Sequence, residues 1–216
     1  TGAFAATVTA IYVPLPGFLL LPLSILAGII AGGLYATLVA VLNMKFQSSI
    51  VICTLMLNYV ANYIASYLVS YPFKDKSGDG LSLVTKTIPE STHFLQFSSS
   101  NTLNLGIVVA AVITILFFYM ERKTVFGYES KMTGLNPHFA KYGGVFEKKV
   151  MLKTMALSGA IAAVAGMCEI FGYKYRYTDG MFTSASYAWT GLMAALIADL
   201  HPVGILVSSI FLSGLQ

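Results

Sequence analysis

Charged residues are scarce in this 216-residue chain, because Asp, Glu, Lys and Arg together make up only 10% of it. Soluble domains hold about 25% charged residues, so the composition excludes an ordinary water-soluble domain. Hydrophobic residues supply 56% of the chain and the mean hydropathy is +0.75. That content also excludes intrinsic disorder, which requires low hydrophobicity. The composition instead indicates an integral membrane protein with several helical spans.

Cysteine is also rare, and familiar catalytic motifs are missing. Cys53 and Cys168 lie in apolar stretches without a C-x-x-C or a Cys/His cluster, so neither a disulfide framework nor a zinc site is indicated. The chain has no G-x-x-x-x-G-K-[ST] phosphate loop, no G-x-S-x-G and no H-E-x-x-H. We therefore expect no metal, no bound cofactor and no ATP hydrolysis by the chain itself.

The positive charge of the chain is concentrated in one segment. Residues 121–153 hold seven Lys or Arg and three acids, whereas the rest of the chain holds six of each. Because Lys and Arg are retained on the cytoplasmic side of a membrane, this excess predicts a cytoplasmic loop at 121–150. The chain starts without Met and stops directly after an apolar run. We expect it to be incomplete, with spans missing at one or both ends.

Apolar runs predict an all-α, polytopic transmembrane bundle that forms a single domain over residues 1–216. Two runs carry small residues at four-residue spacing, which permits close approach of helices. These are Gly28 and Gly32 in one run, and Ser158, Ala162 and Gly166 in another. The predicted spans are 18–42, 50–71, 104–120, 151–171 and a broken 190–216, with polar outer loops at 72–103 and 172–189.

The predicted span 50–71 carries two polar stripes at four-residue spacing. Each step of four turns a helix by about 400°, so the stripes wind together around one side. One interpretation is a solute pathway, in which Asn binds a polar solute and Tyr stacks on a flat one such as a nucleobase. The other is contact between helices, with Tyr as an anchor at the membrane interface. The stripes are Thr54, Asn58, Asn62, Ser66 and Ser70, and Tyr59, Tyr63, Tyr67 and Tyr71; the pathway candidates are Asn58, Tyr59, Asn62, Tyr63 and Ser66.

Three further polar residues are candidates for the pathway. Glu169 is the only acid inside an unbroken predicted span, and an intramembrane acid is a functional candidate. It also lies near enough to the outer end of the span to reach the interface. Asp199 and His201 flank a break before Pro202. A Pro-interrupted apolar segment predicts a broken or re-entrant helix and points to a transport site. Asp199 and His201 could equally cap helix ends.

The basic segment contains the spaced pattern T-x-x-G followed by G-x-N-x-x-x-A-x-Y-x-G. In this it resembles the cytoplasmic loop of ABC-importer permeases of the branched-chain amino acid and monosaccharide type. The string Leu-Met-Leu-Asn-Tyr ending at Tyr59 is most similar to the nucleoside and simple-sugar branch. The chain departs from that family at Ile50, where members often have an acid. The matching residues are Thr124, Gly127, Gly134, Asn136, Ala140, Tyr142 and Gly144.

The resemblance implies that residues 136–142 form a coupling helix that fits a groove of a separate ATPase subunit. Asn before Pro is a favourable helix start, and Gly143–Gly144 is a favourable stop. The residues assigned to coupling are Gly134, Asn136, Pro137, Ala140, Tyr142 and Gly144.

The expected partners are this ATPase, which uses the ATP, a second permease subunit (an identical or a sister chain), an extracytoplasmic substrate-binding protein and the lipid bilayer, with no nucleic acid. The expected location is a prokaryotic plasma membrane. The expected function is import of a small polar solute, a nucleoside first and a simple sugar second. Two alternatives remain: a secondary transporter driven by an ion gradient through Glu169 or Asp199, and a membrane-embedded enzyme that uses Glu169 and His201.

Overall fold

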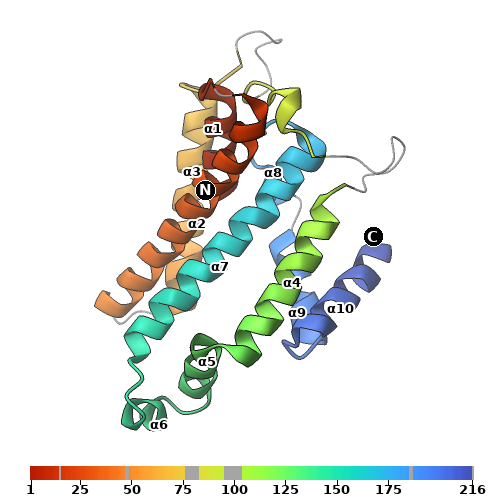
Figure 1. Ribbon diagram of the computed structural model, residues 1–216. Coiled ribbons are helices and arrows are strands. Elements are labelled where there is room, and N and C mark those ends of the chain that lie inside the picture. The colour runs from red at the N-terminus through yellow and green to blue at the C-terminus, as the bar shows by residue number, and fades with distance from the viewer. Residues whose placement is uncertain (15, 47–48, 76–82, 95–103, 185–186, 216) are drawn as a thin grey trace. The chain divides into compact units, whose positions relative to one another are not determined.

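The computed structural model describes residues 1–14, 16–46, 49–75, 83–94, 104–184 and 187–215. Over these ranges the chain is helical, and its β structure is limited to two isolated bridges, Lys74 with Thr85 and Val84 with Thr178. This confirms the predicted all-α fold class (Figure 1). Parts of the predicted outer loops (76–82, 95–103 and 185–186) and Gln216 of the last predicted segment lie outside the described residues.

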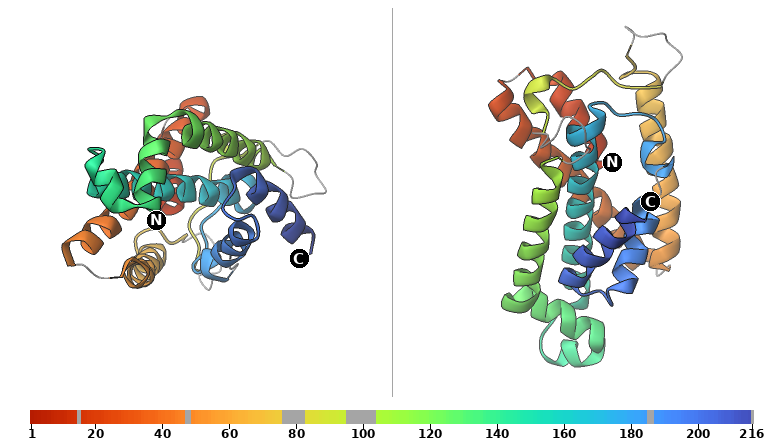
Figure 2. Two further views of the ribbon diagram at one scale, coloured as in Figure 1. Left: turned by 90° about the horizontal axis from the view of Figure 1, so that it is seen from below. Right: turned by 90° about the vertical axis from the view of Figure 1, so that its right-hand side faces the viewer.

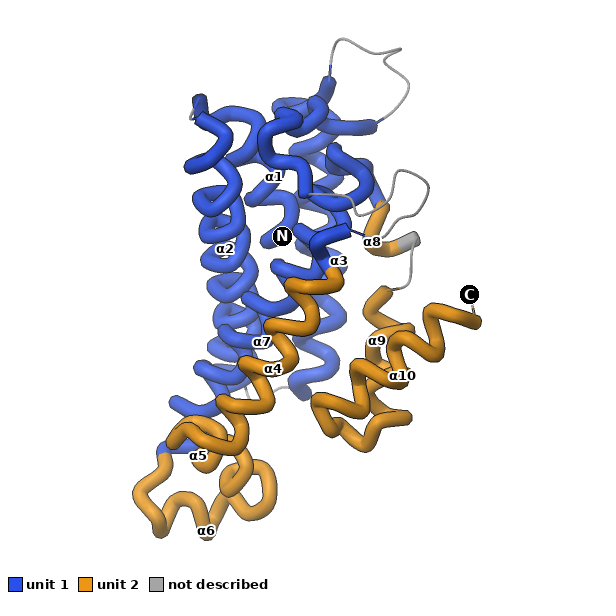
Figure 3. The backbone as a smooth tube through the Cα atoms, turned by 45° about the vertical axis from the view of Figure 1, so that its right-hand side comes forward, with its two compact units in different colours: residues 1–106, 146–180 blue, residues 107–145, 181–216 orange. Residues whose placement is uncertain are grey.

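The contacts between helices divide the chain into two compact units, coloured separately in Figure 3. Unit 1 consists of residues 1–106 and 146–180, and unit 2 of residues 107–145 and 181–216. Unit 1 holds α1 (Gly2–Tyr12), α2 (Gly17–Phe46), α3 (Ile50–Ser70), the 3-10 turn η1 (Glu90–Thr92), α7 (Glu147–Glu169) and the π-helix η2 (Ile170–Lys174). Unit 2 holds α4, α5, α6, α8, α9 and α10, whose bounds follow.

Glycines allow α1, α2 and α7 to pack with their backbones in close contact. A Cβ added at Gly28 of α2 would lie 2.6 Å from the sulfur of Met167, and one added at Gly32 would lie 2.6 Å from the carbonyl oxygen of Gly159. Gly28 and Gly32 therefore act as predicted from their spacing. On α7, however, the buried face runs through Gly159, Ala163 and Met167, while Ser158 and Ala162 are exposed. The stripe through Ser158, Ala162 and Gly166 is thus not the face that packs against α2.

The two predicted outer loops of unit 1 pack against each other. Thr85 donates its N–H to the carbonyl of Tyr177 (3.0 Å), and its hydroxyl accepts the Tyr177 N–H (3.0 Å). Further along, Phe94 donates to the carbonyl of Phe171 (2.9 Å). His93 also stacks on Tyr175, with ring centroids 3.9 Å apart. These pairings attach the described part of the loop after α3 to the segment that follows α7.

Unit 2 begins with three consecutive helices, of which the second and third lie in the predicted cytoplasmic loop. α4 (Gly106–Lys123), which starts at the end of unit 1, is followed by α5 (Val125–Leu135) and α6 (Pro137–Tyr142). Thr124 forms the corner between the first two: its hydroxyl accepts the N–H of Gly127 (3.2 Å) and donates to the carbonyl of Met120. Gly127 faces that same carbonyl, and an added Cβ would lie 2.6 Å from its oxygen. The Thr-x-x-Gly pattern is therefore the sequence of a tight turn between helices.

The last predicted segment is a pair of helices that folds back on itself. α8 (Met181–Ser184) precedes α9 (Tyr187–Ile197), and α10 (Pro202–Gly214) follows. Figure 2 shows α9 and α10 side by side, and the hydroxyl of Ser208 donates to the carbonyl of Ala194 (2.8 Å). In the turn between the two helices, Asp199 and Leu200 have φ of 50° and 60°. Helix α9 cannot continue through this turn, because Pro202 has no N–H to donate and its ring would clash with the preceding helical turn. The predicted break is therefore a hairpin of two short helices.

Three helices among the described residues are long and apolar enough to cross a membrane: Gly17–Phe46, Ile50–Ser70 and Glu147–Lys174. α2 has 30 residues, about 45 Å at 1.5 Å per residue, and so exceeds the hydrocarbon thickness of about 30 Å. It extends beyond the predicted span 18–42, and the third helix begins before the predicted residue 151. α4 begins two residues after the start of the predicted span 104–120 and ends in three charged residues, Glu121, Arg122 and Lys123.

Candidate functional site

The segment assigned to coupling contains a short helix, α6, with clear ends. The side chain of Asn136 accepts the N–H of Phe139 (3.1 Å), and Pro137 occupies the first turn. This is the start predicted from Asn-Pro, because Asn satisfies a free N–H and Pro has no N–H to satisfy. Gly144 ends the segment with φ +80°, a conformation that favours glycine. The sequence therefore predicted the local structure of this helix correctly.

The other coupling candidates divide into buried and exposed groups. Tyr142 is 94% exposed and Phe139 is 58% exposed, so α6 presents two aromatic rings outward. Ala140 is only 3% exposed and its carbonyl accepts the N–H of Val145 (3.0 Å), so it supports the loop from inside. Gly134 lies in α5 and has no atom within 4 Å of an added Cβ. Nothing among the described residues therefore requires glycine at position 134.

The two stripes of α3 lie at different angles from the helix that α3 packs against. Ala65 and Val69 are buried, and the carbonyl of Leu57 accepts the hydroxyl of Tyr35 of α2 (2.5 Å). Tyr59, Tyr63 and Tyr67 are 62–75% exposed. Each of these tyrosines is two residues away from Leu57 or Ala65, which lie on the packed side of α3. An offset of two residues turns a helix by about 200°, so the tyrosines face away from α2. The Asn/Ser stripe is offset by one residue and borders the packed face, with Asn58 exposed and Asn62 half-buried.

Ser66 connects α3 to the predicted outer loop. Its hydroxyl donates to Oδ2 of Asp179 (3.0 Å), 113 residues away in the sequence. Asp179 in turn donates its backbone N–H to the carbonyl of Leu83 (3.1 Å). Burial, and secondly the nearby Asp179 carboxylate, raise the pKa of Tyr177, so its phenol stays neutral at physiological pH. Ser66 therefore has a structural contact in unit 1, whatever it does for a solute.

The remaining pathway candidates belong to different units. Glu169, in unit 1, has a cationic neighbour: its Oε1 lies 4.0 Å from Nζ of Lys174 at the end of the π-helix. Glu169 therefore has an oppositely charged neighbour within its own unit. Asp199 and His201, in unit 2, are exposed, and His201 is the N-cap residue of α10 without a side-chain capping bond. The His201 ring instead lies 6.1 Å from the ring of Phe118, edge-on.

Two groups of residues were missed in the sequence analysis. Asp179 looked like one polar residue in a loop, because its contact with Ser66 depends on how that loop returns to α3. Phe118, Arg122 and Lys131 surround a pocket next to His201. Their spacing on α4 and α5 is visible in the sequence, but the return of His201 from a distant segment is not.

Comparison with known proteins assigns the chain to a class. Its whole length, residues 1–216, matches the family described as the permease component of branched-chain amino acid transport systems. The chain belongs to this family of membrane permeases. Together with the long apolar helices, membership confirms a multi-pass protein of the inner membrane.

Curated relatives show where in the family the chain lies. It is 27% identical to a nucleoside ABC transporter permease of Lactococcus lactis, over 94% of the chain and 57% of that protein. It is 29% identical to a guanosine ABC transporter permease of Bacillus subtilis, over 93% of the chain and 58% of that protein. It is also 29% identical to a glucose ABC transporter permease of Haloferax volcanii, over 97% of the chain and 57% of that protein. These relatives confirm the resemblance to the nucleoside and simple-sugar branch.

The chain spans less than three fifths of the length of these relatives. No solved structure matches it.

Proposed function

We propose that the chain is part of the permease subunit of an ABC importer that moves a nucleoside, or as second choice a simple sugar, into the cytoplasm. The observation that carries this proposal is the full-length family match together with relatives named for nucleoside and guanosine transport. The partners would be an ATPase subunit, a second permease subunit and an extracytoplasmic binding protein. The chain itself would bind no cofactor, and ATP would be used by the ATPase.

In this proposal α6 carries the contact with the ATPase. A helix of six residues is about 9 Å long and so acts as one rigid piece. Tyr142 and Phe139 would enter the partner's groove, since both are exposed aromatic residues, the type enriched at protein interfaces. Asn136 and Gly144 would fix the two ends of the helix. Ala140, being buried, would position α6 and would not touch the partner.

The coupling proposal is tested with Tyr142→Asp in the full-length transporter, measured as ATPase activity stimulated by substrate and binding protein. We expect this stimulation to be lost while the permease stays folded, because Tyr142 is almost fully exposed. Ala140→Asp is unsuitable, since a buried charge would disrupt the loop itself. Lys141→Gln is the matched control, exposed on the same helix. Normal stimulation in the Tyr142 variant would contradict the assignment.

The solute pathway would include the exposed face of α3. An amide such as that of Asn58 is costly in contact with lipid, so a membrane helix that exposes it needs protein or water there. Tyr63, which follows Asn62 on the same helix, is 75% exposed. We propose that Asn58, Tyr59, Asn62, Tyr63 and Ser66 line the pathway, with Glu169 near its outer end and Asp199 and His201 at the helix break.

Uptake of radiolabelled nucleoside and sugar into cells that lack other importers tests both the pathway and the solute. We expect nucleoside uptake that stops when ATP is depleted and persists when an uncoupler removes the ion gradient. Asn58→Ala and Tyr63→Ala should reduce uptake, whereas Val60→Ala, exposed on the same helix, should not. Unchanged uptake in both polar variants would refute the pathway wall. Uptake that depends on the gradient and not on ATP would refute the importer.

A further inference from the structure

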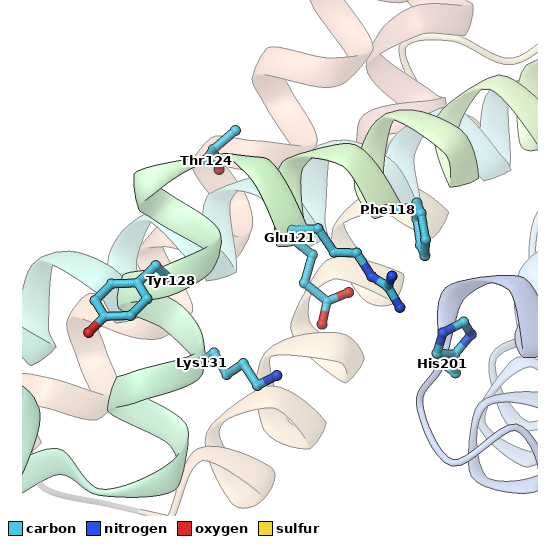
Figure 4. A pocket seen from close by; sticks show the side chains of 7 residues that line it. Phe118, Glu121, Thr124, Tyr128, Lys131 and His201 are labelled. Carbon is cyan, nitrogen blue, oxygen red and sulfur yellow. The ribbon is translucent and has the colours of Figure 1, made fainter.

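A pocket of about 380 Å³ lies inside unit 2, where α4 meets α5 (Figure 4). Three chain segments contribute to it: the last turns of α4, the first two turns of α5 with the corner before them, and the turn before α10. In Figure 4 the charged ends of Glu121 and Lys131 point into the space between the helices, and the imidazole of His201 closes one side. The lining residues are Phe118, Glu121, Arg122, Thr124, Tyr128, Lys131 and His201.

The helical repeat explains why these residues share one pocket. Phe118, Glu121 and Arg122 lie three and four residues apart on α4, so they occupy one face. Tyr128 and Lys131 are three apart on α5 in the same way. The Thr124 corner turns the α5 face toward the α4 face. The guanidinium of Arg122 lies 4.4 Å above the ring of Phe118, which keeps its position defined.

The charges of the pocket favour an anion. Arg122 and Lys131 supply two positive charges against one negative charge from Glu121, and the His201 ring adds nitrogen atoms that can form hydrogen bonds. A metal ion is disfavoured, since no group of three or more His, Cys, Asp or Glu gathers among the described residues. A neutral sugar or nucleoside would leave one positive charge of the pocket without a counter-charge. An Arg fork beside a Lys is instead suited to phosphate oxygens.

We propose that this pocket binds the phosphate group of an anionic ligand at the cytoplasmic surface of the membrane. The position of the pocket favours a phospholipid headgroup as the source of that phosphate. α4 is apolar up to Met120 and then becomes charged, as a helix does where it leaves the hydrocarbon. The inner leaflet is rich in anionic headgroups, and basic pockets at this depth bind them. A free phosphate or nucleotide offers the same chemistry.

A phosphate held between Arg122 and His201 would connect two parts of unit 2. Arg122 is at the end of α4, whereas His201 is in the turn between α9 and α10. Thr124 is not available as a ligand, because its hydroxyl already bonds within the corner. The ligand would therefore fix the hairpin to the end of α4 through charge-assisted bonds. This site is independent of the solute that the proposed importer carries.

The test uses the full-length permease, purified in detergent and stripped of lipid, with binding counted by native mass spectrometry. The lipid probes are phosphatidylglycerol and phosphatidylcholine. We expect phosphatidylglycerol to bind preferentially, and the double variant Arg122→Gln, Lys131→Gln to lose about tenfold in affinity, since charge-assisted bonds are the strong ones. The matched control is Lys123→Gln, Lys148→Gln, which removes the same charge from exposed residues outside the pocket and should change affinity less than about twofold.

Inorganic phosphate and a nucleoside monophosphate form the second arm, measured by calorimetry on the same protein. If either soluble probe binds, and the double variant Arg122→Gln, Lys131→Gln abolishes that binding, the proposal is supported and the ligand is a soluble phosphate. If only phosphatidylglycerol binds, the proposal is supported and the ligand is a lipid headgroup. Equal losses in the two double variants would overturn it, because binding would then follow overall charge. Failure of every probe to bind would also overturn it.

Thermal unfolding without probe checks that the variants fold. Should the double variant fail to fold, Arg122→Lys decides the test, since it keeps the charge and loses the fork; unchanged affinity in that variant would count against the pocket. If the wild-type permease binds lipid at this pocket but shows no ATP-driven uptake, the importer proposal is contradicted and the phosphate site is not.

Discussion

Gly32 of α2 and Gly159 of α7 lie with their backbones in direct contact. A Cβ added at Gly32 would stand 2.6 Å from the carbonyl oxygen of Gly159, and one added at Gly159 would stand 2.5 Å from that of Gly32. Neither obstacle is a flexible side chain that could move aside. The pair therefore sets how closely the two longest helices of unit 1 approach.

Replacing Gly159 with Ala is expected to destabilise unit 1 by about 1–3 kcal/mol, the usual cost of overpacking a tight contact. The measurement is the thermal unfolding midpoint of the purified permease. Gly191→Ala is the control, because Gly191 is helical and has open space around it; the helix propensity of Ala should leave its midpoint unchanged or higher. Equal midpoints for the two variants would show that α2 and α7 separate easily.

Removing the cap of α6 should weaken coupling without altering the exposed aromatic residues. Asn136→Ala loses the acceptor of the Phe139 N–H, at a cost of about 0.5–2 kcal/mol to a helix of one to two turns. We expect faster hydrogen exchange at residues 138–142 and lower stimulated ATPase activity. Asn136→Asp keeps a capping oxygen and should retain most of both. If Asn136→Ala and Asn136→Asp show the same hydrogen exchange and the same stimulated ATPase activity, the cap does not support coupling.

A variant at Gly134 can show whether this glycine is needed for contact with the ATPase or for the fold of the permease itself. Ala at this position should leave the permease as stable or slightly more stable, because nothing lies within 4 Å of an added Cβ and Ala favours a helix. If the ATPase approaches the bare backbone at Gly134, the same variant should bind it more weakly. Affinity of the permease for the ATPase, measured beside the unfolding midpoint, tests this. Unchanged affinity would indicate that no partner packs at Gly134.

The hydrogen bond from Ser66 to Asp179 should hold the outer loop against α3. Ser66→Ala is expected to speed hydrogen exchange in residues 83–88 and 175–180, since a bond to a charged acceptor contributes about 1.5–3 kcal/mol. Ser70→Ala is the matched control, because the Ser70 hydroxyl bonds to the carbonyl of Ser66 within its own helix. Similar exchange in the two variants would show that other contacts hold the loop.

Local structure could be predicted well from the sequence. Asn136–Pro137 and Gly143–Gly144 located α6, and Asp199–Pro202 located the break between α9 and α10. Caps, prolines and glycines act within a few residues of themselves, so their effect can be deduced without the rest of the fold. The low charge and the basic segment likewise predicted a membrane protein with a cytoplasmic loop at 121–150, and the family match agrees with a membrane permease.

Contacts between distant segments were decided only by the tertiary structure. The sequence analysis predicted close contact through Ser158, Ala162 and Gly166 of α7, whereas α1 and α2 pack against Gly159 and Ala163 instead. It gave no sign that Ser66 meets Asp179 or that His201 returns to Phe118. A helix repeat specifies which residues share a face, but the partner of that face depends on the path of the whole chain, because burial is non-directional and rewards any well-packed arrangement.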